Sequence, residues 1–439
     1  MLLAEKARFR ALGPRHLADI AQEYGISAEH RDAIEVHASV LPFRTNAYVL
    51  GELIDWSDVP DDPIFQLVFP QPGMLRPEHH ELARRLRDDA APAQRAKGIA
   101  GIRAALNPHP SGQRELNVPS VSEGPLPGLQ HKYAQTVLYF PAHGQTCHAY
   151  CTYCFRWAQF VGDADLKFAA PSPTALVAYL HAHPQVTDVL VTGGDPMIMV
   201  TERLESHIET LLAVPTVRTI RFGTKAPAYW PQRFVSDADA DDLLRLFERI
   251  IAAGKSVAVM AHYSHDRELS TDIARAAIAR IRGTGAVVYC QAPIMRRIND
   301  DPGTWRRMWS DQLGLGAVPY YMFMARDTGP RAYFEVPIAR AVDIFAEAVR
   351  QLPGLARTVR GPVMSTTPGK ILIDGSLSTG GSRVFSARFV QARDAGLTGR
   401  PFLLEHSDTA VWADELRAAP GTQEDIVQAL ATVGREDEG

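Results

Sequence analysis

Short apolar runs alternate with helical patterns between about residues 130 and 366, and this alternation constrains the fold more than any other feature. Six runs are rich in β-branched or aromatic residues: TVLYF (136–140), TDVLVTGG (187–194), RTIRFGTK (218–225), SVAVMAHY (256–263), AVVYCQAPIM (286–295) and VPYYMFMA (318–325). Strands and helices in alternation predict parallel strands joined by right-handed crossovers. The chain is therefore expected to have an α/β fold.

The ends of these runs favour one α/β architecture. Polar residues gather where the strands end, as in GGD (193–195), GTK (223–225), HYSH (262–265) and at Gln291. The active sites of α/β barrels lie at the carboxyl ends of the strands. We therefore expect a partial (β/α)6 TIM-like barrel rather than a doubly wound sheet.

The segments on either side of the alternating region have different patterns. Residues 1–125 are expected to form an N-terminal helical and extended region, beginning with the helical patterns HLADIAQEYG and SAEHRDAIEVHASVL and ending in a polar loop. The barrel is expected over residues 126–366. Residues 367–439 are expected to form a C-terminal region with a strand at KILIDG and a helical tail.

Composition excludes several classes of partner. The net charge of −4 gives no electrostatic reason to expect nucleic acid or an anionic membrane. No apolar run approaches the roughly 18 residues of a membrane span, and the first residues, MLLAEKARFRALG, lack a signal-peptide pattern. We expect a cytoplasmic protein with neither nucleic acid nor membrane as partner.

Three of the four cysteines fall within eight residues, as Cys147-x-x-x-Cys151-x-x-Cys154. Three thiolates so spaced can bind three irons of a [4Fe–4S] cluster and leave the fourth iron open. A structural zinc site needs four ligands, and His148 could complete one only with strained geometry. Three buried structural cysteines fit poorly with the polar residues between them. An iron–sulfur cluster is favoured over both alternatives.

The cysteine segment resembles the signature of the radical S-adenosylmethionine (SAM) superfamily, including the aromatic Tyr153 before the last cysteine. The resemblance implies that SAM chelates the open iron and is cleaved to a 5′-deoxyadenosyl radical, which abstracts a substrate hydrogen. Gly193-Gly194-Asp195 resembles a second superfamily mark, whose glycines would let the backbone approach the SAM amino group. Tyr153 and this triplet are therefore the expected SAM-binding residues.

The resemblance extends over most of the chain to the lysine 2,3-aminomutase family, as a divergent member. The similar segments are VLPFRTNAY (40–48), PDDPIFQLVFP (60–70), GPLPGLQHKY (124–133), YCTYCFR (150–156), VLVTGGDPMIM (189–199), IRFGTKAPAYWPQRF (220–234), GAVVYCQAPIMRRIND (285–300) and PYYMFMARDTG (319–329). The resemblance implies an isomerase that uses pyridoxal phosphate (PLP) to move an amino group from the α- to the β-carbon of an amino acid.

Several residues match functional positions of that family. Arg156 matches an arginine that binds the substrate α-carboxylate, a bidentate pairing. Gln291 matches a residue near the PLP phosphate, and Lys132 stands in place of a phosphate-binding arginine. Lys370, in STTPGK, stands where the family places its PLP lysine. The alternatives are a surface arginine at 156 and a solvated loop cation at 370.

The departures from the family pattern bear on cofactors. The glycine-rich run before the PLP lysine is shortened to Pro368-Gly369-Lys370, and Thr136 replaces a second phosphate-binding arginine. Both changes weaken the case for PLP, because a phosphate dianion needs cationic or backbone donors. The family's C-terminal zinc cysteines are absent, so no zinc is expected, and Cys290 is expected to be a buried strand residue.

The substrate pocket also departs from the family. Lysine-specific members hold the distal ammonium with two aspartates, and these positions are occupied here by Arg326 and Thr366. An arginine would repel lysine and favour an acidic amino acid. A shift of one residue would instead bring in Asp327, which attracts a cation.

Three hypotheses follow. The first is a PLP-dependent 2,3-aminomutase on an amino acid other than lysine. The second is a radical SAM enzyme of the same architecture that has lost PLP and performs another hydrogen abstraction. The third is a non-catalytic electron-transfer iron–sulfur protein. For either enzyme we expect a small amino acid substrate, an electron donor such as flavodoxin or ferredoxin, and a homo-oligomer.

Overall fold

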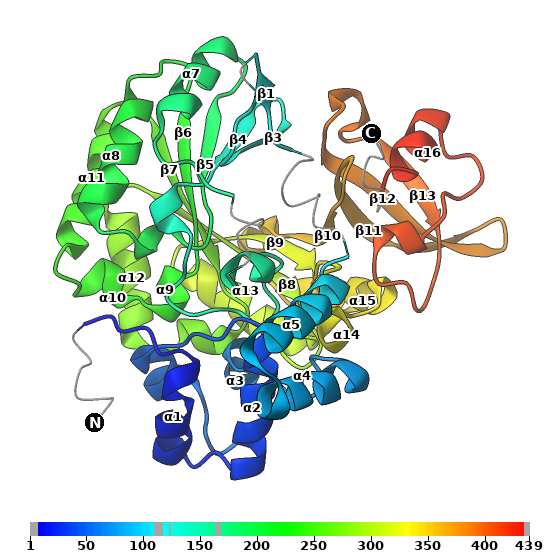
Figure 1. Cartoon of the computed structure of the whole chain (residues 1–439). Coiled ribbons are helices and arrows are strands. Elements are labelled where there is room, and N and C mark those ends of the chain that lie inside the picture. The colour runs from blue at the N-terminus through cyan, green and yellow to red at the C-terminus, as the bar shows by residue number, and fades with distance from the viewer. Residues whose placement is uncertain (1–7, 109–116, 123, 163–167, 434–439) are drawn as a thin grey trace.

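A curved sheet organises the computed structural model of the chain, which describes residues 8–108, 117–122, 124–162 and 168–433. Its strand order is β13-β12-β11-β10-β9-β8-β7-β6-β5-β4-β3, with 11 strands among the described residues. A second sheet of two strands, β1 (Ser120–Val121) and β2 (Gly124–Pro125), is not hydrogen-bonded to the first; β1 lies beside β3 and β4 (Figure 1). Part of the expected polar loop, residues 109–116, lies outside the described ranges.

The parallel part of the sheet has one strand more than expected. Its strands are β4 (Thr136–Tyr139), β5 (Asp188–Val191), β6 (Thr219–Thr224), β7 (Ser256–His262), β8 (Val287–Ile294), β9 (Val318–Met324) and β10 (Arg360–Ser365). Each of the six expected runs forms one of them. The expected six-strand count is corrected by β10, which follows a helix and pairs parallel to β9.

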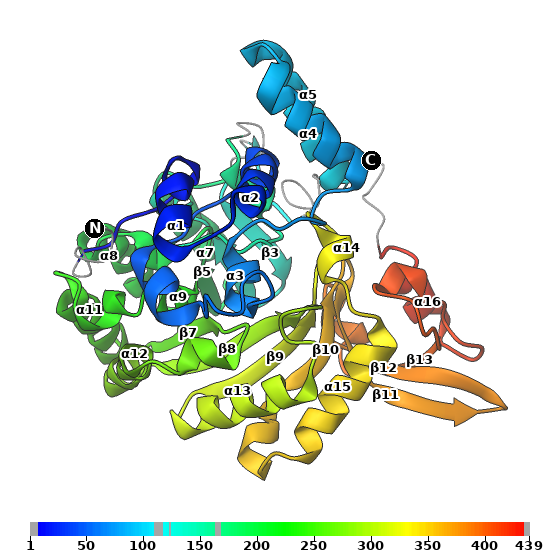
Figure 2. The ribbon, with the colours of Figure 1, turned by 90° about the horizontal axis from the view of Figure 1, so that it is seen from below.

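Six helices connect the parallel strands and lie along the outer face of the sheet (Figures 1 and 2): α7 (Thr174–Ala182), α8 (Thr201–Leu212), α11 (Ala240–Ala252), α12 (Asp272–Gly283), α13 (Pro302–Gly314) and α15 (Ile338–Arg350). Alternation along each strand decides which side chains meet them. On β6, Phe222 is buried and stacks on Phe247 of α11, with ring centroids 5.2 Å apart. The side chain of its neighbour Arg221 points to the opposite, concave face.

The expected N-terminal helices are confirmed as α1 (Leu17–Tyr24) and α2 (Ala28–Val40), which are followed by α3 (Pro63–Val68). The Ser27 side chain caps α2 by accepting a hydrogen bond from the His30 amide. Buried residues of these helices belong to the same hydrophobic core as the strands. The N-terminal helices therefore pack directly on the sheet region.

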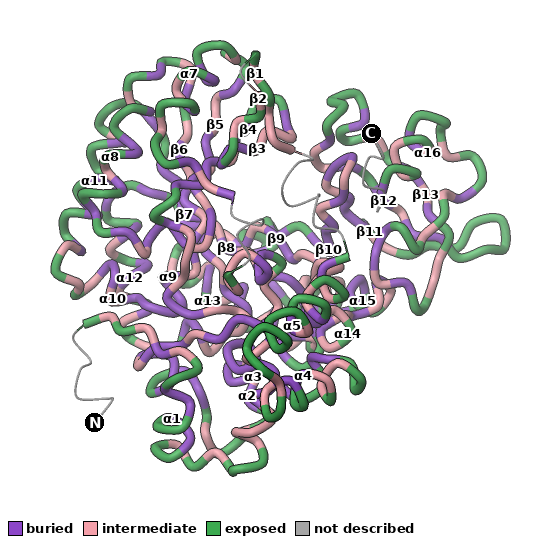
Figure 3. The backbone as a smooth tube through the Cα atoms, viewed as in Figure 1, coloured by how far each residue is buried: buried purple, intermediate pink, exposed green. Residues whose placement is uncertain are grey.

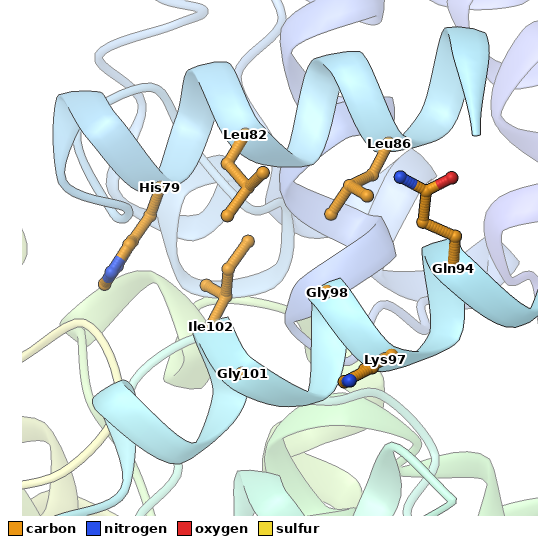
Figure 4. Close-up of a pocket in the computed structure, with 8 residues that line it drawn as sticks. All are labelled: His79, Leu82, Leu86, Gln94, Lys97, Gly98, Gly101 and Ile102. Atoms are coloured by element: carbon orange, nitrogen blue, oxygen red, sulfur yellow. The ribbon is translucent and has the colours of Figure 1, made fainter.

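Two further helices, α4 (Pro77–Asp89) and α5 (Pro92–Leu106), form a hairpin that projects from the body (Figure 2). A hollow of about 510 Å³ opens between them (Figure 4). It is lined by His79, Leu82, Leu86, Gln94, Lys97, Gly98, Gly101 and Ile102. None of the residues expected at the functional site lines this hollow.

The C-terminal region is mostly strand. The KILIDG strand is confirmed within β11 (Gly369–Thr379), which pairs antiparallel with β10 and with β12 (Ser382–Ala392). β13 (Pro401–Glu405) follows, and the described part of the expected helical tail contains the short α16 (Glu424–Leu430). The strands β12 and β13 were not expected from the sequence. The far end of the β11–β12 hairpin is exposed (Figure 3).

The first strand of the main sheet, β3 (Leu129–Tyr133), was also missed by the sequence analysis. It pairs antiparallel with β4 at one edge of the sheet. The ammonium of Lys132 on β3 nonetheless donates a hydrogen bond to the Thr366 carbonyl, in the turn between β10 and β11. The sheet is therefore curved enough to bring β3 to that turn.

Short helices complete the described structure: η2 (Pro14–His16), the π-helix η3 (Val49–Leu53), η4 (Ala142–Gly144), η5 (Trp157–Phe160), η7 (Pro196–Ile198), α9 (Ala226–Tyr229), α10 (Gln232–Val235), η8 (Asp266–Leu269), α14 (Arg331–Phe334), η9 (Gly354–Thr358), η10 (Ala395–Leu397) and η11 (Ala413–Glu415). Within the described ranges, no helix combines the length and the apolar character that a bilayer crossing requires.

Candidate active site

The cysteine loop follows β4 and is held by hydrogen bonds from the N-terminal region. The buried Asn46 donates to the carbonyls of His148, at 3.2 Å, and Tyr229, at 3.0 Å. Arg44 donates to the Cys147 carbonyl at 3.2 Å. No role for Arg44 or Asn46 was expected from the sequence. The one indication in the sequence is that these two polar residues lie in the largely apolar segment 40–48.

The three cysteines of this loop form no disulfide, and each of them is partly exposed. Burial raises the pKa of each thiol, to about 12 for Cys154, and the other two thiols add to the rise at Cys147. Among the described residues, no three His, Cys, Asp or Glu side chains converge closely enough to hold a single metal ion. In a [4Fe–4S] cluster each cysteine binds a different iron, and bound iron supplies the positive charge that thiolates need. The donor set therefore fits a cluster.

The two glycines of the Gly193-Gly194-Asp195 triplet are required by close packing against this loop. A Cβ at Gly194 would lie 2.5 Å from the backbone nitrogen of Thr146, and one at Gly193, where φ is +147°, would overlap the Gln145 side chain. The Asp195 amide donates to the Thr146 carbonyl at 2.8 Å. The triplet is therefore part of the support of the cysteine loop.

The carboxylate of Asp195 links the ends of β5 and β6. It accepts hydrogen bonds from the Thr224 hydroxyl, at 2.7 Å, and from the amides of Met197 and Lys225, each at 2.9 Å. Burial raises the pKa of Asp195 to about 6. A direct contact of Asp195, Gly193 or Gly194 with SAM stays a prediction.

An ion pair that the sequence analysis missed lies at the ends of β6 and β7. The Lys225 ammonium is 2.7 Å from a carboxylate oxygen of Glu268, whose side chain is 0% exposed. Lys225 also donates to the Ser264 hydroxyl at 3.2 Å, and that hydroxyl is 3.0 Å from the Tyr153 hydroxyl. Tyr153 is thereby fixed at the mouth of the site, beside a buried cation.

Gln291 lies on β8 opposite His262 on β7. Its amide nitrogen donates to His262 Nε2 at 2.9 Å, which assigns the ring proton to Nδ1. Burial lowers the pKa of His262 to about 3, so the imidazole is neutral at physiological pH. This pair presents a neutral donor at the carboxyl ends of the strands.

Arg156 is buried, with 8% of its surface exposed, so the alternative of a surface arginine is wrong. Its guanidinium lies 4.1 Å from the centre of the Phe140 ring and donates to the Gln159 side chain at 3.3 Å. Burial lowers the pKa of Arg156 to about 10. Within the described part of the chain it makes no ion pair with a carboxylate. A buried guanidinium without a carboxylate is suited to bind an anion.

Lys132 and Lys370 both lie near the ring of Tyr133. Their ammonium groups are 5.3 Å and 5.2 Å from the centre of the Tyr133 ring. Burial lowers the pKa of Lys132 to about 6 and that of Lys370 to about 8, and nearby cations, such as Arg221 beside Lys370, add to both shifts. Lys370 also donates to the Gln391 side chain at 2.9 Å. It lies on strand β11, so the alternative of a solvated loop cation is wrong.

The surroundings of these lysines fit an anionic cofactor. Nε of Arg326 is buried and makes no hydrogen bond among the described residues. The buried hydroxyl of Tyr133 interacts with the Ser365 side chain. The cation Lys132 meets a carbonyl there rather than a carboxylate. A phosphate would supply acceptors for both cations. Thr136 is uncharged and adds no positive charge here. Its hydroxyl donates a hydrogen bond to Asp188 at 3.2 Å.

Arg326 and Arg156 both lie near the ring of Phe155. The guanidinium carbon of Arg326 is 5.7 Å from the centre of the exposed Phe155 ring, and that of Arg156 is 5.8 Å from the same centre. Asp327 Oδ1 lies 3.7 Å from Arg326 Nε. The Thr366 hydroxyl donates to the Gly369 carbonyl at 2.8 Å and so stabilises the β10–β11 turn. Substrate contacts of Arg326 and Thr366 stay predictions.

Cys290 is buried on β8, with 2% of its surface exposed, as expected. Its side chain points to the helices, whereas its neighbour Gln291 points to the concave face. The site is thus assembled from the carboxyl ends of the parallel strands, from β3 and from the start of β11.

Comparison with known proteins gives the following relatives. No family model matches the chain. A protein of Aquifex aeolicus named "Putative L-lysine 2,3-aminomutase" is 32% identical over 403 residues, which are 91% of this chain and 94% of that protein. The L-lysine 2,3-aminomutase of Fusobacterium nucleatum is 28% identical over 51% of this chain and 49% of its own length, so that match spans about half of the enzyme. Streptococcus suis SuiB bound to S-adenosylmethionine superposes with a TM-score of 0.35 and 11% identity, over 61% of this chain and 56% of SuiB.

Proposed function

Because this chain belongs to the lysine 2,3-aminomutase family of radical SAM enzymes, we propose that it is a 2,3-aminomutase that uses a [4Fe–4S] cluster, SAM and PLP on an amino acid other than lysine. Bound at the site, the cluster and SAM would supply a radical that removes a substrate hydrogen, and PLP would supply the carbonyl that carries the migrating nitrogen.

Each end of the site has its own residues for this chemistry. Cys147, Cys151 and Cys154 are the cluster ligands, and the hydrogen bond between Tyr153 and Ser264 fixes the loop at the mouth. Arg156 binds and orients the substrate α-carboxylate, because it is a buried guanidinium that lacks a carboxylate partner within the described ranges.

The lysine end binds PLP through two amines with different tasks. Lys132 binds the phosphate. The negative charge of a bound phosphate raises the pKa of about 6 that burial gives this amine, and so favours its charged form. Lys370 is the nucleophile, and its pKa of about 8 leaves a substantial neutral fraction at neutral pH, which ordinary lysines lack. The observation that carries the proposal is this pair of desolvated lysines near the ring of Tyr133.

The experiment is a visible spectrum of the purified protein after PLP is supplied. The wild type is expected to show the absorption of PLP bound to a lysine, and Lys370→Ala is expected to lose it. Removal of iron should leave the absorption in place. Wild-type protein with no such absorption would refute the role of PLP.

We further propose an acidic substrate such as glutamate or aspartate. The guanidinium carbons of Arg326 and Arg156 lie 5.7 Å and 5.8 Å from the centre of the Phe155 ring, so both cations border the same part of the site. Asp327 is paired with Arg326 and offers no separate negative charge. Two guanidinium groups suit a substrate with two carboxylates.

A test of this substrate class compares Arg326→Gln with the wild type. We expect kcat/KM for the acidic substrate to fall roughly 10- to 100-fold in the variant. Equal activity of the wild type on lysine and on glutamate would refute the assignment.

A PLP-independent radical SAM reaction is the second candidate. It is favoured by Thr136, which provides no positive charge for a phosphate. The Thr136 hydroxyl is already hydrogen-bonded to Asp188. The visible spectrum after addition of PLP distinguishes the two candidate functions. Both functions need a one-electron donor of flavodoxin or ferredoxin type.

A further inference from the structure

An irregularity in the strand pairing places one particular side chain opposite Lys370. Along β11 and β12, Ile371 pairs with Phe389 and Leu372 with Arg388, whereas Lys370 pairs with Gln391. One extra residue, Val390, is therefore inserted on β12 as a β-bulge. Without it, the register would place Val390 opposite the lysine. Bulges re-aim side chains and are frequent beside active sites.

The backbone is packed tightly at the same point. A Cβ at Gly369 would collide with the carbonyl oxygen of Gln391 and would lie 2.9 Å from Cα of Ala392. Only glycine permits this approach of β11 to β12. The glycine that precedes the lysine therefore serves to seat Lys370 against Gln391, through the 2.9 Å hydrogen bond from the ammonium to the amide oxygen.

The other groups around the amine come from five further strands. Asp188 on β5 favours its charged form, and Arg221 on β6 and Arg360 on β10 oppose it. Its ammonium lies 5.2 Å from the ring centre of Tyr133 on β3 and 5.5 Å from that of Tyr321 on β9. Among the partners on the described strands, Gln391 alone is a neutral hydrogen-bond acceptor at contact distance.

We propose that Gln391 is a positioning residue for Lys370: its amide oxygen holds the amine between two tyrosine rings, and its neutrality keeps that amine available as a nucleophile. The proposal rests on the proposed function, in which Lys370 reacts with the aldehyde of PLP. A carboxylate at this place would hold the amine equally well but would keep it protonated.

The test uses the full-length protein without PLP. Its lysines are labelled with acetic anhydride over a pH series, and the peptide that contains Lys370 is quantified by mass spectrometry. Wild-type labelling of Lys370 is expected to have its midpoint near pH 8. In the isosteric variant Gln391→Glu the midpoint should rise by at least about one unit, so that labelling at pH 8 falls several-fold to tenfold.

A second variant and a control complete the design. Gln391→Met removes the acceptor without adding charge, so its labelling midpoint should not rise, while PLP capture at pH 8 should slow several-fold. Gln351→Glu makes the same charge change at an exposed site after α15 and should leave both readouts at wild-type values.

The outcomes distinguish this inference from the proposed function. Wild-type protein that binds no PLP refutes the proposed function, whereas the labelling of Lys370 still tests Gln391. An unchanged midpoint in Gln391→Glu, in protein whose circular dichroism and melting match the wild type, overturns the positioning role of Gln391.

Discussion

Two parts of the site, the cysteine loop (residues 147–154) and the lysine region (Lys132, Lys370 and Arg326), hold their functional side chains by different kinds of contact. The cysteine loop is fixed through its backbone, by donors such as Asn46 and the Asp195 amide and by the close approach of Gly194. In the lysine region the functional side chains make the contacts themselves: Lys132 and Arg326 donate to the carbonyls of Thr366 and Ser365, and Lys370 donates to the Gln391 side chain.

This difference separates two tasks. A backbone-fixed loop gives the same geometry whatever the surrounding charge, which suits a cluster ligand set. A region assembled from side chains can change its charge by single substitutions, which suits substrate and cofactor specificity. The predictions below test each half of this comparison, from the largest expected effect to the smallest.

Removal of one cluster cysteine should have the largest effect. In Cys151→Ser, iron content is expected to fall far below the roughly four atoms per chain of a [4Fe–4S] protein, and 5′-deoxyadenosine formation should cease. Cys290→Ser is the matched control, because Cys290 is buried on β8 outside the loop. Full iron and undiminished SAM cleavage in Cys151→Ser would contradict the ligand assignment.

A methyl group at Gly194 should break the support of the loop. The added Cβ would meet the Thr146 backbone, which cannot move as a flexible side chain can. We expect Gly194→Ala to lower the free energy of unfolding by about 2 kcal/mol or more and to abolish SAM cleavage. Denaturant titration measures the first effect.

Gly283→Ala provides the control for that change. Gly283 lies at the end of α12, and no atom outside the helix lies within 4 Å of the place that an added methyl group would occupy. The substitution should leave SAM cleavage intact and stabilise the protein slightly, because alanine is a better helix former. Equal losses in both variants would show that close packing at Gly194 is not the cause.

Arg156→Gln should weaken substrate binding without lowering the stability of the fold. Loss of the guanidinium is expected to raise KM for the amino acid roughly 10- to 100-fold. Stability should stay equal or increase, because the wild type buries a charge without a carboxylate partner in the described structure. Arg245→Gln, at an exposed ion pair with Asp242, should leave KM unchanged. A loss of stability with an unchanged KM would assign Arg156 a purely structural role.

The smallest expected effect is a pH dependence of stability in protein free of PLP. The pKa of Lys132 is lowered in the folded state to about 6, so the unfolded chain binds more protons above that pH, and this lysine makes folding more favourable as pH rises from about 6 towards its unfolded pKa. Lys132→Met removes the penalty of a buried ammonium. The stability advantage of the variant over the wild type should be largest at pH 6 and smaller at pH 9. Parallel stability curves would contradict the lowered pKa.

The two regions also differ in how far the sequence predicts them. The cysteine loop and the Gly193-Gly194-Asp195 triplet are contiguous motifs, and the six expected strands follow from local apolar runs, so sequence reasoning found them. The triplet's packing against Thr146 was missed, because such packing depends on the path of a loop some 50 residues away.

The lysine region shows what local patterns cannot supply. β3 and β12 carry mixed polar and apolar residues without clear alternation, and they become strands because tertiary pairing overrides weak local preference. Gln391 reaches Lys370 only through a bulge, and the Lys225–Glu268 pair joins the ends of two strands. Neither arrangement has a signal in spacing or composition.

One measurement tests the central claim most directly. Anaerobically reconstituted protein is supplied with SAM, PLP, a reductant and glutamate labelled with ¹⁵N, and the position of the nitrogen is followed by NMR. The account predicts that the label moves from the α- to the β-carbon while 5′-deoxyadenosine forms. Formation of 5′-deoxyadenosine with the label still on the α-carbon of glutamate, and likewise of every other amino acid offered, would contradict it.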